Sequence, residues 1–484
     1  MSIVTELDLH KYRRTKIVAT IGPSSADPST IAQLIAAGVD VFRVNMSHGE
    51  HNAHRQSIAT VRECADRLGI HTAVLADLCG PKIRTGKFAN NNVDLVAGRS
   101  VIVTTRDVLG DLATIPSQYP ALSSDVRPGD RILLNDGAVE LKVEGVTGPD
   151  VECIVVAGGQ VGDNKGINLP GVALSAPSLT LKDHDDAQFA LSEQVDFLAL
   201  SFVRSGADIE ALRKLVEQAQ WSPMIIAKIE KPEALENSAD IIAASDGIMV
   251  ARGDLGVELN PEQVPLAQHQ LINHAIAANK PVIVATQTLE SMISSARPTR
   301  AEVTDVSHAV GSGTDAVMLS GETAVGQYPV RAVAMMDRVA RQTESYYRYS
   351  ASTLKPTNVV LRSRIVPFGD AIADAAAQLV KNTHASAILV ISNRGMTAAT
   401  ISAARPEAPV VAISDEPRIC RRMSLMWGVV PHWDKFLSKE KPTAVARRVA
   451  RELKLAATGE FIVLVRGFHS EPELNTPTLS LVVV

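Results

Sequence analysis

The feature that most constrains this chain is a unit that recurs eight times. Each unit is a short apolar, β-branched run, then a polar or glycine-containing turn, then a longer stretch of helical character. The apolar runs are continuous rather than alternating, which is typical of strands buried on both faces, and strands alternating with helices indicate a parallel sheet. Eight such units predict a (β/α)8 TIM barrel. The runs lie at 15–21, 39–45, 72–78, 195–202, 224–230, 247–253, 281–287 and 315–321.

Two stretches depart from this rhythm, and at roughly 150 residues per domain a chain of 484 residues has room for about three domains. Short alternating segments fill 87–182, and Asn135-Asp136-Gly137 between two of them is a strong hairpin signal. We expect an inserted all-β domain there, after strand 3, with the form of a β-barrel lid. Apolar runs resume after residue 345 with helices between them, which predicts a C-terminal doubly wound α/β domain over 346–484. The barrel then comprises 15–86 and 183–345, after an N-terminal tail of 1–14.

The charge balance excludes several classes of function. The chain has 48 Lys and Arg against 53 Asp and Glu, a net charge of −5, and only 9 Phe, 6 Tyr and 3 Trp. It therefore has neither the basic field nor the stacking platforms of a nucleic-acid reader, and no field for an anionic membrane. No apolar run approaches the ~18 residues that span a bilayer, and the first residues lack a signal peptide's apolar core. A cytoplasmic enzyme is the expectation.

Polar residues follow nearly every predicted barrel strand. Active sites of such barrels lie at the carboxyl ends of the strands, so these side chains are expected to converge. Glu230 and Asp254 are hard oxygen ligands suited to Mg²⁺ or Mn²⁺, and Arg43 and Lys228 supply the positive charge that phosphoryl transfer needs. A structural network of ion pairs at the barrel rim is the alternative at this point. The residues are Arg43, Asn45, Ser47, Asp77, Ser201, Lys228, Glu230, Arg252, Asp254, Thr286, Gln287, Ser320 and Glu322.

Seven segments in order along the barrel carry a family resemblance. They are TKIVATIGPSS, FRVNMSHG, AKIEKPEAL, VARGDLGVE, VATQTLESM, RPTRAEVTDV and LSGETAVGQYP, and GINLPG at 166–171 closes the insertion. Together they resemble the pyruvate kinase family. The resemblance implies transfer of a phosphoryl group from phosphoenolpyruvate to ADP, giving pyruvate and ATP, in a homotetramer.

The resemblance also implies a role for each matching residue. Mg²⁺ would bind Glu230 and Asp254, Lys228 would contact the transferring phosphoryl group and the enolate oxygen, and Arg43 would hold the phosphate. The backbone around Gly253 would bind the substrate carboxylate, and Arg84 is a further substrate-binding candidate. Thr286 would belong to the proton path to the enolate carbon, together with a water or a second group, and Ser320 and Glu322 resemble the neighbours of that path.

One departure from the family pattern concerns the monovalent cation. K⁺-requiring members carry DTKGPEIRTG after the third strand, where Asn, Ser, Asp and a Thr carbonyl coordinate K⁺. In this chain Asn45, Ser47 and Asp77 are present, but Leu78 replaces the threonine and Lys82 replaces the glutamate. The ammonium of Lys82 can supply the charge of K⁺ and would repel the ion itself. The pair resembles the K⁺-independent, bacterial-type branch, so we expect a requirement for Mg²⁺ but not for K⁺.

The C-terminal domain carries a second candidate site. Its first strand runs into Ser392, Asn393, Arg394, Gly395 and Thr397 before a helix, which matches the family's allosteric loop in position. With the loop after Gly467 it predicts a site for a phosphorylated small-molecule effector. An ordinary turn without ligand is the alternative.

Two other functions are compatible with parts of the pattern. One is a metal-dependent lyase or aldolase acting on phosphoenolpyruvate or pyruvate, which has no evident use for a lid that covers ADP and excludes water. The other is a non-catalytic metabolite-sensing module, which would not need Lys228, Glu230, Asp254 and Thr286 together.

Overall fold

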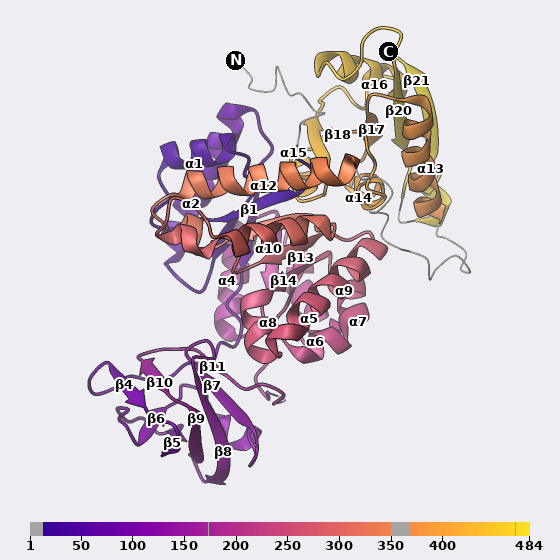
Figure 1. Cartoon of the computed structure of the whole chain (residues 1–484). Helices are drawn as coiled ribbons and strands as arrows, with labels where there is room; N and C mark the ends of the chain where they lie inside the picture. Colours follow the sequence, from indigo (N-terminus) through magenta and orange to yellow (C-terminus); the bar gives the residue numbers. More distant parts are fainter. Residues whose placement is uncertain (1–12, 173, 350–367, 470) are drawn as a thin grey trace.

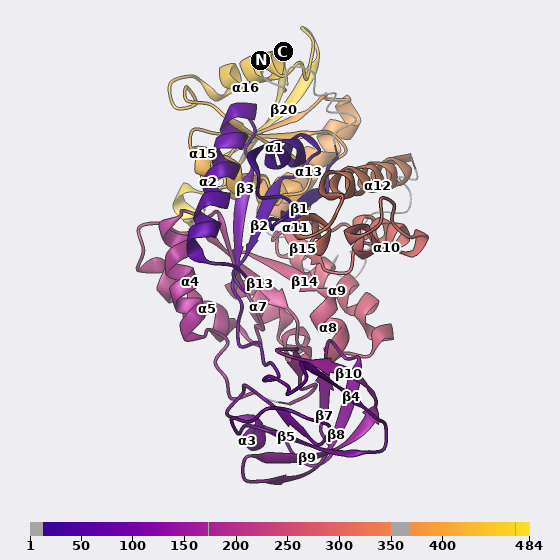
Figure 2. The same cartoon turned by 90° about the vertical axis from the view of Figure 1, so that its left-hand side faces the viewer.

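A computed structural model describes residues 13–172, 174–349, 368–469 and 471–484. The chain is arranged as three bodies in a row, with the barrel in the middle (Figure 1). The inserted β domain lies at one end and the C-terminal α/β domain at the other, as a view from the side also shows (Figure 2). The barrel thus has one neighbouring domain at each of its two ends.

Eight parallel strands close into the predicted barrel in the order β1-β16-β15-β14-β13-β12-β3-β2. This confirms the expected fold class. Most of their residues are buried because one face points into the barrel and the other packs beneath the helices. The strands are β1 (Lys16–Thr20), β2 (Val41–Asn45), β3 (Ala73–Asp77), β12 (Phe197–Leu200), β13 (Met224–Ile229), β14 (Gly247–Ala251), β15 (Val282–Ala285) and β16 (Ala316–Leu319).

Helices surround the barrel, and several begin at capping residues in the sequence. Asp27 caps α1 with Pro28 behind it, and Thr180 and Thr299 form capping boxes at α4 and α10. The helices are α1 (Pro28–Ala36), α2 (His51–Leu68), α4 (Leu181–Ser192), α5 (Gly206–Glu217), α6 (Pro232–Glu236), α7 (Ser238–Ala244), α8 (Arg252–Glu258), α9 (Val264–Ala277), α10 (Arg300–Gly311), α11 (Gly321–Ala324) and α12 (Pro329–Tyr349).

The insertion is built of β-strands, but its sheets differ from the β-barrel that the sequence predicts. Six strands form a sheet in the order β11-β7-β8-β9-β5-β6, and β4 and β10 form a second sheet of two. Closure requires every strand to have two neighbours, and in the described residues β4 and β10 pair only with each other. The elements are β4 (Asn92–Leu95), β5 (Ser100–Thr104), β6 (Thr114–Pro116), α3 (Leu122–Asp125), β7 (Arg131–Leu134), β8 (Val139–Thr147), β9 (Asp150–Ala157), β10 (Gly159–Gly162) and β11 (Ile167–Asn168).

The C-terminal domain is the predicted doubly wound α/β fold, with a sheet in the order β19-β18-β17-β20-β21. Helices α13, α14 and α15 pack on one face and α16 on the other. Only the last strand is antiparallel. The elements are α13 (Phe368–Thr383), β17 (Ile388–Ile391), α14 (Met396–Ala403), β18 (Val410–Ser414), α15 (Pro417–Met423), β19 (Val429–Trp433), α16 (Pro442–Glu452), β20 (Phe461–Arg466) and β21 (Thr478–Val483).

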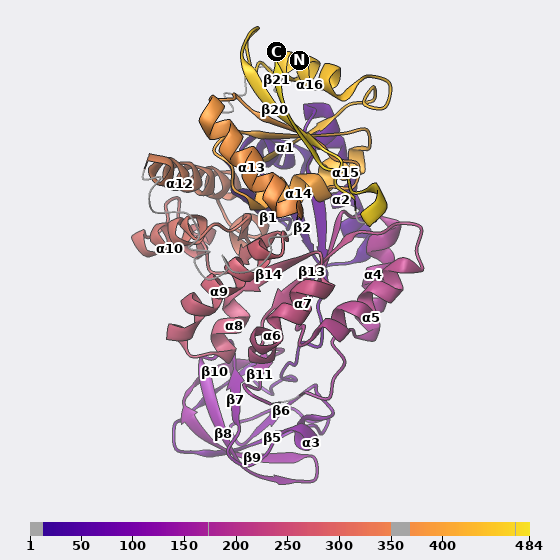
Figure 3. The same cartoon turned by 90° about the vertical axis from the view of Figure 1, so that its right-hand side faces the viewer.

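The C-terminal domain closes the end of the barrel where the strands begin (Figure 3). Leu425 is fully buried in the cluster that fills the barrel interior. Ion pairs surround this contact: Arg421 Nε lies 2.9 Å from Asp196 Oδ1, and Arg405 Nη1 lies 2.9 Å from Asp315 Oδ1. The opposite end, where the strands finish, is the one that faces the insertion.

The exact domain limits stay a prediction. At two of these limits, the structure shows residues that pack or continue beyond the expected boundary. Arg13 and Arg14, assigned to the N-terminal tail, are buried, and Arg13 pairs with Asp40 and Asp337. Residues 1–12 lie outside the described residues. Helix α12 continues to Tyr349, past the expected start of the third domain at 346. Among the described helices, none has both the length and the apolarity to span a bilayer.

Candidate active site

A cluster of charges lies at the carboxyl ends of β2, β3 and β13. Lys228 Nζ is 2.9 Å from Glu230 Oε1 and 3.2 Å from Asp77 Oδ1. It also donates a hydrogen bond of 2.7 Å to Ser201 Oγ, whose hydroxyl donates to the carbonyl of Leu78. Burial opposes the charged form of Lys228, but the neighbouring carboxylates of Asp77 and Glu230 outweigh it and raise its pKa. The ammonium is therefore charged throughout the physiological range.

Asp77 holds the two cations of the site together. Arg43 Nε donates a 2.7 Å bond to Asp77 Oδ2, and Arg43 Nη1 donates to Thr20 Oγ1 at 3.1 Å. Burial raises the pKa of this carboxyl, but Lys228 and Arg43 overcome the effect and lower it overall. An ionised Asp77 therefore holds both cations against one carboxylate.

Two carboxylates of the site, those of Glu230 and Asp254, repel each other. Glu230 is buried and accepts a hydrogen bond of 2.8 Å from the Phe202 N–H. Burial and the charge of Asp254 raise the pKa of Glu230. With Arg43 and Lys228 against Asp77, Glu230 and Asp254, the ionised cluster carries one net negative charge.

This arrangement fits a divalent cation. A doubly charged ion would relieve the repulsion between Glu230 and Asp254 and bring the cluster to +1, which suits an anionic substrate. Among the described residues no group of three or more His, Cys, Asp or Glu side chains is placed to hold a metal ion. Two carboxylates leave most coordination positions open, as Mg²⁺ bound with waters and phosphate oxygens requires.

The end of β15 is held in an uncommon backbone conformation beside α8. Thr286 and Gln287 have φ of 65° and 51°, and Arg252 Nη2 donates to both of their carbonyls, at 2.9 and 3.1 Å. Left-handed residues other than glycine cost of order 1–3 kcal/mol and persist at functional sites. The Gly253 N–H donates to Thr286 Oγ1 at 2.6 Å. The Thr286 hydroxyl is thus fixed at the first turn of the helix that carries Asp254.

Ser320 and Glu322 follow β16, and the structure assigns them different environments. The Glu322 carboxylate accepts hydrogen bonds from the N–H of Leu289, the hydroxyl of Thr288 and the N–H of Ser320. It therefore ties the ends of β15 and β16 together. Ser320 Oγ is buried and makes no hydrogen bond within the described part of the chain.

The residues of the expected monovalent-cation region differ in burial: Leu78 lies in the core and Lys82 at the surface. The Leu78 side chain packs in the core, and Asn45 Oδ1 accepts a bond of 3.2 Å from the Ser47 N–H. Lys82 is exposed. Burial and then the positive charges of Arg84, Lys82 and Arg43 lower the pKa of His48, so these three cations gather around one histidine. Arg84 also donates to the Asn164 carbonyl of the insertion at 3.0 Å.

Two family models match the chain. The pyruvate kinase barrel domain matches residues 12–333, and the pyruvate kinase alpha/beta domain matches residues 370–482. The chain belongs to the pyruvate kinase family.

Individual relatives agree with this assignment. Pyruvate kinase 2 of Synechocystis sp. is 42% identical over 460 residues, which cover 94% of this chain and 76% of the relative. A pyruvate kinase of Sporosarcina psychrophila is 43% identical over 87% of this chain and 71% of its own length. A crystal structure of a pyruvate kinase from Cryptosporidium parvum matches with a TM-score of 0.87 at 35% identity, covering 98% of this chain and 97% of that one.

Membership of the pyruvate kinase family confirms the predicted function, that of a phosphotransferase enzyme. It decides against the lyase or aldolase and against the non-catalytic sensor. The roles of the single residues and the K⁺-independent branch stay predictions.

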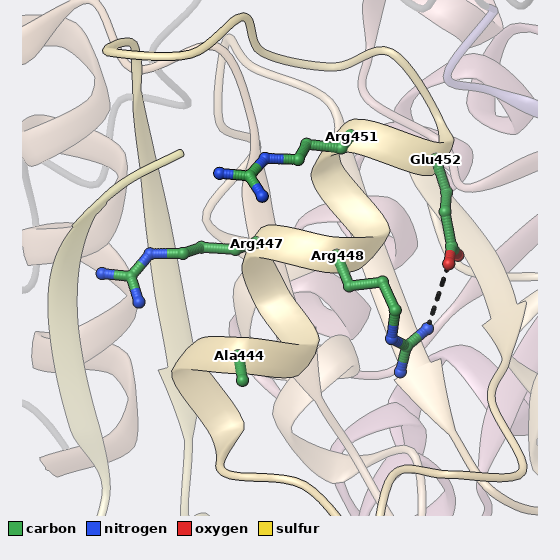
Figure 4. Close-up of a pocket in the computed structure, with 5 residues that line it drawn as sticks. All are labelled: Ala444, Arg447, Arg448, Arg451 and Glu452. Carbon is green, nitrogen blue, oxygen red and sulfur yellow. Dashed lines mark hydrogen bonds and ion pairs between the residues drawn. The ribbon is translucent and has the colours of Figure 1, made fainter.

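In this pyruvate kinase the expected effector loop joins β17 to α14. Ser392 and Thr397 are buried, Asn393 and Arg394 are exposed, and Gly395 has a φ of 88°. Ser392 Oγ is buried and, in the described ranges, makes no hydrogen bond. A shallow hollow lined by Ala444, Arg447, Arg448, Arg451 and Glu452 lies elsewhere, on α16 (Figure 4). Since α14 and α16 cover opposite faces of the sheet, the hollow is separate from the loop.

The sequence reasoning missed three polar residues next to the site. Thr20 ends β1 and binds Arg43, and the strand-end rule that found the other residues applies to it equally. Lys231 and Glu258 form a buried pair behind the carboxylates. Glu258 ends a helix rather than a strand, so no local signal marked it.

Proposed function

We propose that Lys228 stabilises the negative charge that develops when this enzyme moves a phosphoryl group from phosphoenolpyruvate to ADP, giving pyruvate and ATP. The observation that carries this assignment is the cluster of Asp77, Ser201 and Glu230 around its Nζ, with the longest of the three contacts at 3.2 Å. A fixed ammonium aimed at the reacting oxygens needs no reorganisation during the reaction.

Glu230 and Asp254 would hold the divalent ion, and pyruvate kinases generally use Mg²⁺. When bound there, Mg²⁺, or Mn²⁺ in its place, supplies positive charge to the oxygens of the transferring group. The residues of the chain do the rest of the positioning. Asp77 contacts both Arg43 and Lys228, at 2.7 and 3.2 Å, and so offsets part of the positive charge beside the two metal-binding carboxylates.

Arg43 would bind the substrate phosphate, since its Nη2 nitrogen is the part of the guanidinium that neither Asp77 nor Thr20 contacts. Gly253 would present its N–H to the substrate carboxylate, which must then replace the hydrogen bond to Thr286 Oγ1. The Thr286 hydroxyl would keep its own hydrogen bond to the Ala285 carbonyl, at 2.7 Å. Thr286 and Ser320 would then line the proton path to the enolate carbon, with a water completing it because a hydroxyl is a poor acid at neutral pH.

The insertion would act as a lid over this mouth. Arg84 lies on the segment that enters the insertion and reaches its Asn164 carbonyl, so it is placed to bind substrate from the hinge side. Exclusion of water from the phosphoryl group protects transfer from competing hydrolysis.

We also propose that the enzyme works without K⁺, that a phosphorylated small molecule binds at residues 392–397, and that four chains assemble. K⁺ independence is supported by the positive charges of Lys82, Arg43 and Arg84 around His48. The effector site is supported by the Ser392 hydroxyl, which has no hydrogen-bond partner among the described residues. Exposed Leu481 and Val483 on the edge strand β21 support assembly. A mass by light scattering that differs from four chains would contradict the tetramer.

The catalytic assignment is tested with Lys228→Met in a coupled assay for pyruvate. We expect kcat to fall by about 10³-fold, the scale at which one preorganised charge donor acts, while the circular dichroism spectrum is retained. Lys214→Met, an exposed lysine on α5, is the matched control and should keep full activity. Pyruvate formation must also require ADP. A fall in kcat of less than tenfold in Lys228→Met would reject the role assigned to Lys228.

A further inference from the structure

A buried ion pair lies just behind the proposed metal site. Lys231 Nζ is 2.5 Å from Glu258 Oε1, and the side chains are only 7% and 1% exposed. Burying two charges costs several kcal/mol each, and well-packed apolar residues often do as well for stability. The pair therefore calls for a role other than stability.

The pair joins the two segments that carry the metal-binding carboxylates. Lys231 directly follows Glu230 and caps α6, while Glu258 lies on α8 four residues after Asp254, about one helical turn away. The other end of α8 is fixed by Arg252, whose guanidinium lies 2.6 Å from Asp305 Oδ1. With both ends of α8 anchored, the separation of Glu230 from Asp254 depends on the contact between Lys231 and Glu258.

The insertion reaches the same atom. Asn168 of β11 donates from Nδ2 to Glu258 Oε1 at 3.3 Å. The turn between β7 and β8 also lies against α8, since a Cβ built on Gly137 would come 3.8 Å from Val257 Cγ1. In Figure 1 the ends of β7 and β11 nearest the barrel lie below α8. Glu258 Oε2 is buried and makes no hydrogen bond within the described residues, so Oε1 carries both contacts.

We propose that Glu258 is a positioning residue. It holds the Glu230 and Asp254 carboxylates at the separation that a divalent ion needs, through Lys231 and α8, and it links that separation to the lid through Asn168. This inference rests on the proposed function in one respect, the binding of the divalent ion by Glu230 and Asp254. Without the Glu258 charge, Lys231 would turn toward the carboxylate next to it in the chain, Glu230, and compete with the metal.

The test measures Mn²⁺ binding to the full chain without substrates, from the electron paramagnetic resonance signal of free Mn²⁺. We expect Glu258→Gln to weaken Mn²⁺ binding by about 10-fold or more, the effect typical of groups that orient metal ligands. Glu262→Gln makes the same charge change at an exposed position four residues on and should bind as the unaltered protein does. Asn168→Ala removes only the lid contact, and we expect a loss of about threefold.

The outcomes separate the two levels of inference. Unchanged Mn²⁺ affinity in Glu258→Gln would overturn the positioning role, and unchanged affinity in Asn168→Ala would overturn the link to the lid. A Glu230→Gln variant that binds Mn²⁺ as tightly as the unaltered protein would instead overturn the proposed metal site. If Glu258→Gln does not fold, Glu258→Asp keeps the charge and shortens the reach, and its affinity is then decisive: a threefold loss supports the proposal and none rejects it.

Discussion

At the scale of single residues, the charge of Lys82 is, with Leu78, one of two features that separate this chain from the K⁺-requiring pattern. Arg84, Lys82 and Arg43 all act on the pKa of His48, so the Lys82 ammonium belongs to the positive field around the proposed phosphate site. A monovalent cation about 4 Å from such a charge is repelled by about 4 kcal/mol at an effective dielectric constant of 20. We therefore expect the site to have no electrostatic need for K⁺ and the Lys82 charge to oppose entry of the ion.

We therefore predict that replacing NaCl with KCl at constant ionic strength changes the rate of the unaltered enzyme by less than about twofold. Lys82→Glu restores the charge of the K⁺-requiring pattern and should make the enzyme K⁺-activated by about 10-fold, in line with a difference of 1.4 kcal/mol. Lys87→Glu makes the same charge change at an exposed position on the same segment and should stay insensitive. Strong activation of the unaltered enzyme by KCl contradicts the prediction.

The sequence identified the residue types at the mouth because they follow from strand ends. It did not identify their pairing. Lys228 and Asp77 lie on strands separated by β12, and their contact depends on the stagger of the closed barrel, which brings Ser201 between them. The stagger of the barrel strands cannot be predicted from local sequence, and the same holds for the contact of Glu258 with Asn168.

At the scale of elements, the predicted barrel strands agree with the structure to within about two residues at each end. The apolar runs extend slightly past the strands: the run over 195–202 becomes β12, Phe197–Leu200, because Asp196 bonds Arg62 and Arg421 and Ser201 turns into the site. In the insertion the hairpin at Asn135 was predictable from its turn residues. The separate β4 and β10 sheet was not, because its partners are more than sixty residues apart.

The loop before α14 carries the element-scale prediction. Its buried Ser392 hydroxyl makes no hydrogen bond in the described residues, and Arg394 is exposed two residues later. A bound phosphate would accept a hydrogen bond from the Ser392 hydroxyl and form an ion pair with the Arg394 guanidinium. In a thermal-shift screen of sugar phosphates and nucleoside monophosphates, a ligand at a hundredfold excess over Kd should raise Tm by roughly 5 °C. Arg394→Ala should lose this shift, and Lys381→Ala, an exposed lysine on α13, should keep it. Identical shifts in all three proteins would reject the site.

At the scale of the whole molecule, the C-terminal domain is part of the barrel's construction. Leu425 enters the interior cluster from the end where the barrel strands begin, and the pair of Arg421 with Asp196 joins residues 225 positions apart. The sequence predicted three domains but not this contact, because an apolar residue in one domain carries no sign that it packs inside another. The two proposed sites thus lie on bodies that share a buried boundary.

A histidine at this boundary makes the stability of the folded chain sensitive to acid. His71 precedes β3, and its carbonyl accepts a hydrogen bond from the Ser424 hydroxyl of the C-terminal domain. Burial, with the charges of His432 and Arg421, lowers the pKa of His71 to about 4. The unfolded chain binds this proton near pH 6.5 and the folded chain does not, so acid favours unfolding. The stability is present above about pH 6.5 and is lost as the pH falls from there toward 4.

Linkage gives the size of this loss. With pKa values of about 6.5 unfolded and about 4 folded, His71 alone costs about 2 kcal/mol of unfolding free energy between pH 7 and pH 5. His71→Asn cannot take up the proton, so its free energy of unfolding in urea should fall by about 2 kcal/mol less over the same interval. His308→Asn, at an exposed position on α10, should follow the unaltered protein. Because burial is the first cause of the low pKa of His71, equal pH dependence in all three proteins would mean that water reaches His71 and would contradict the prediction.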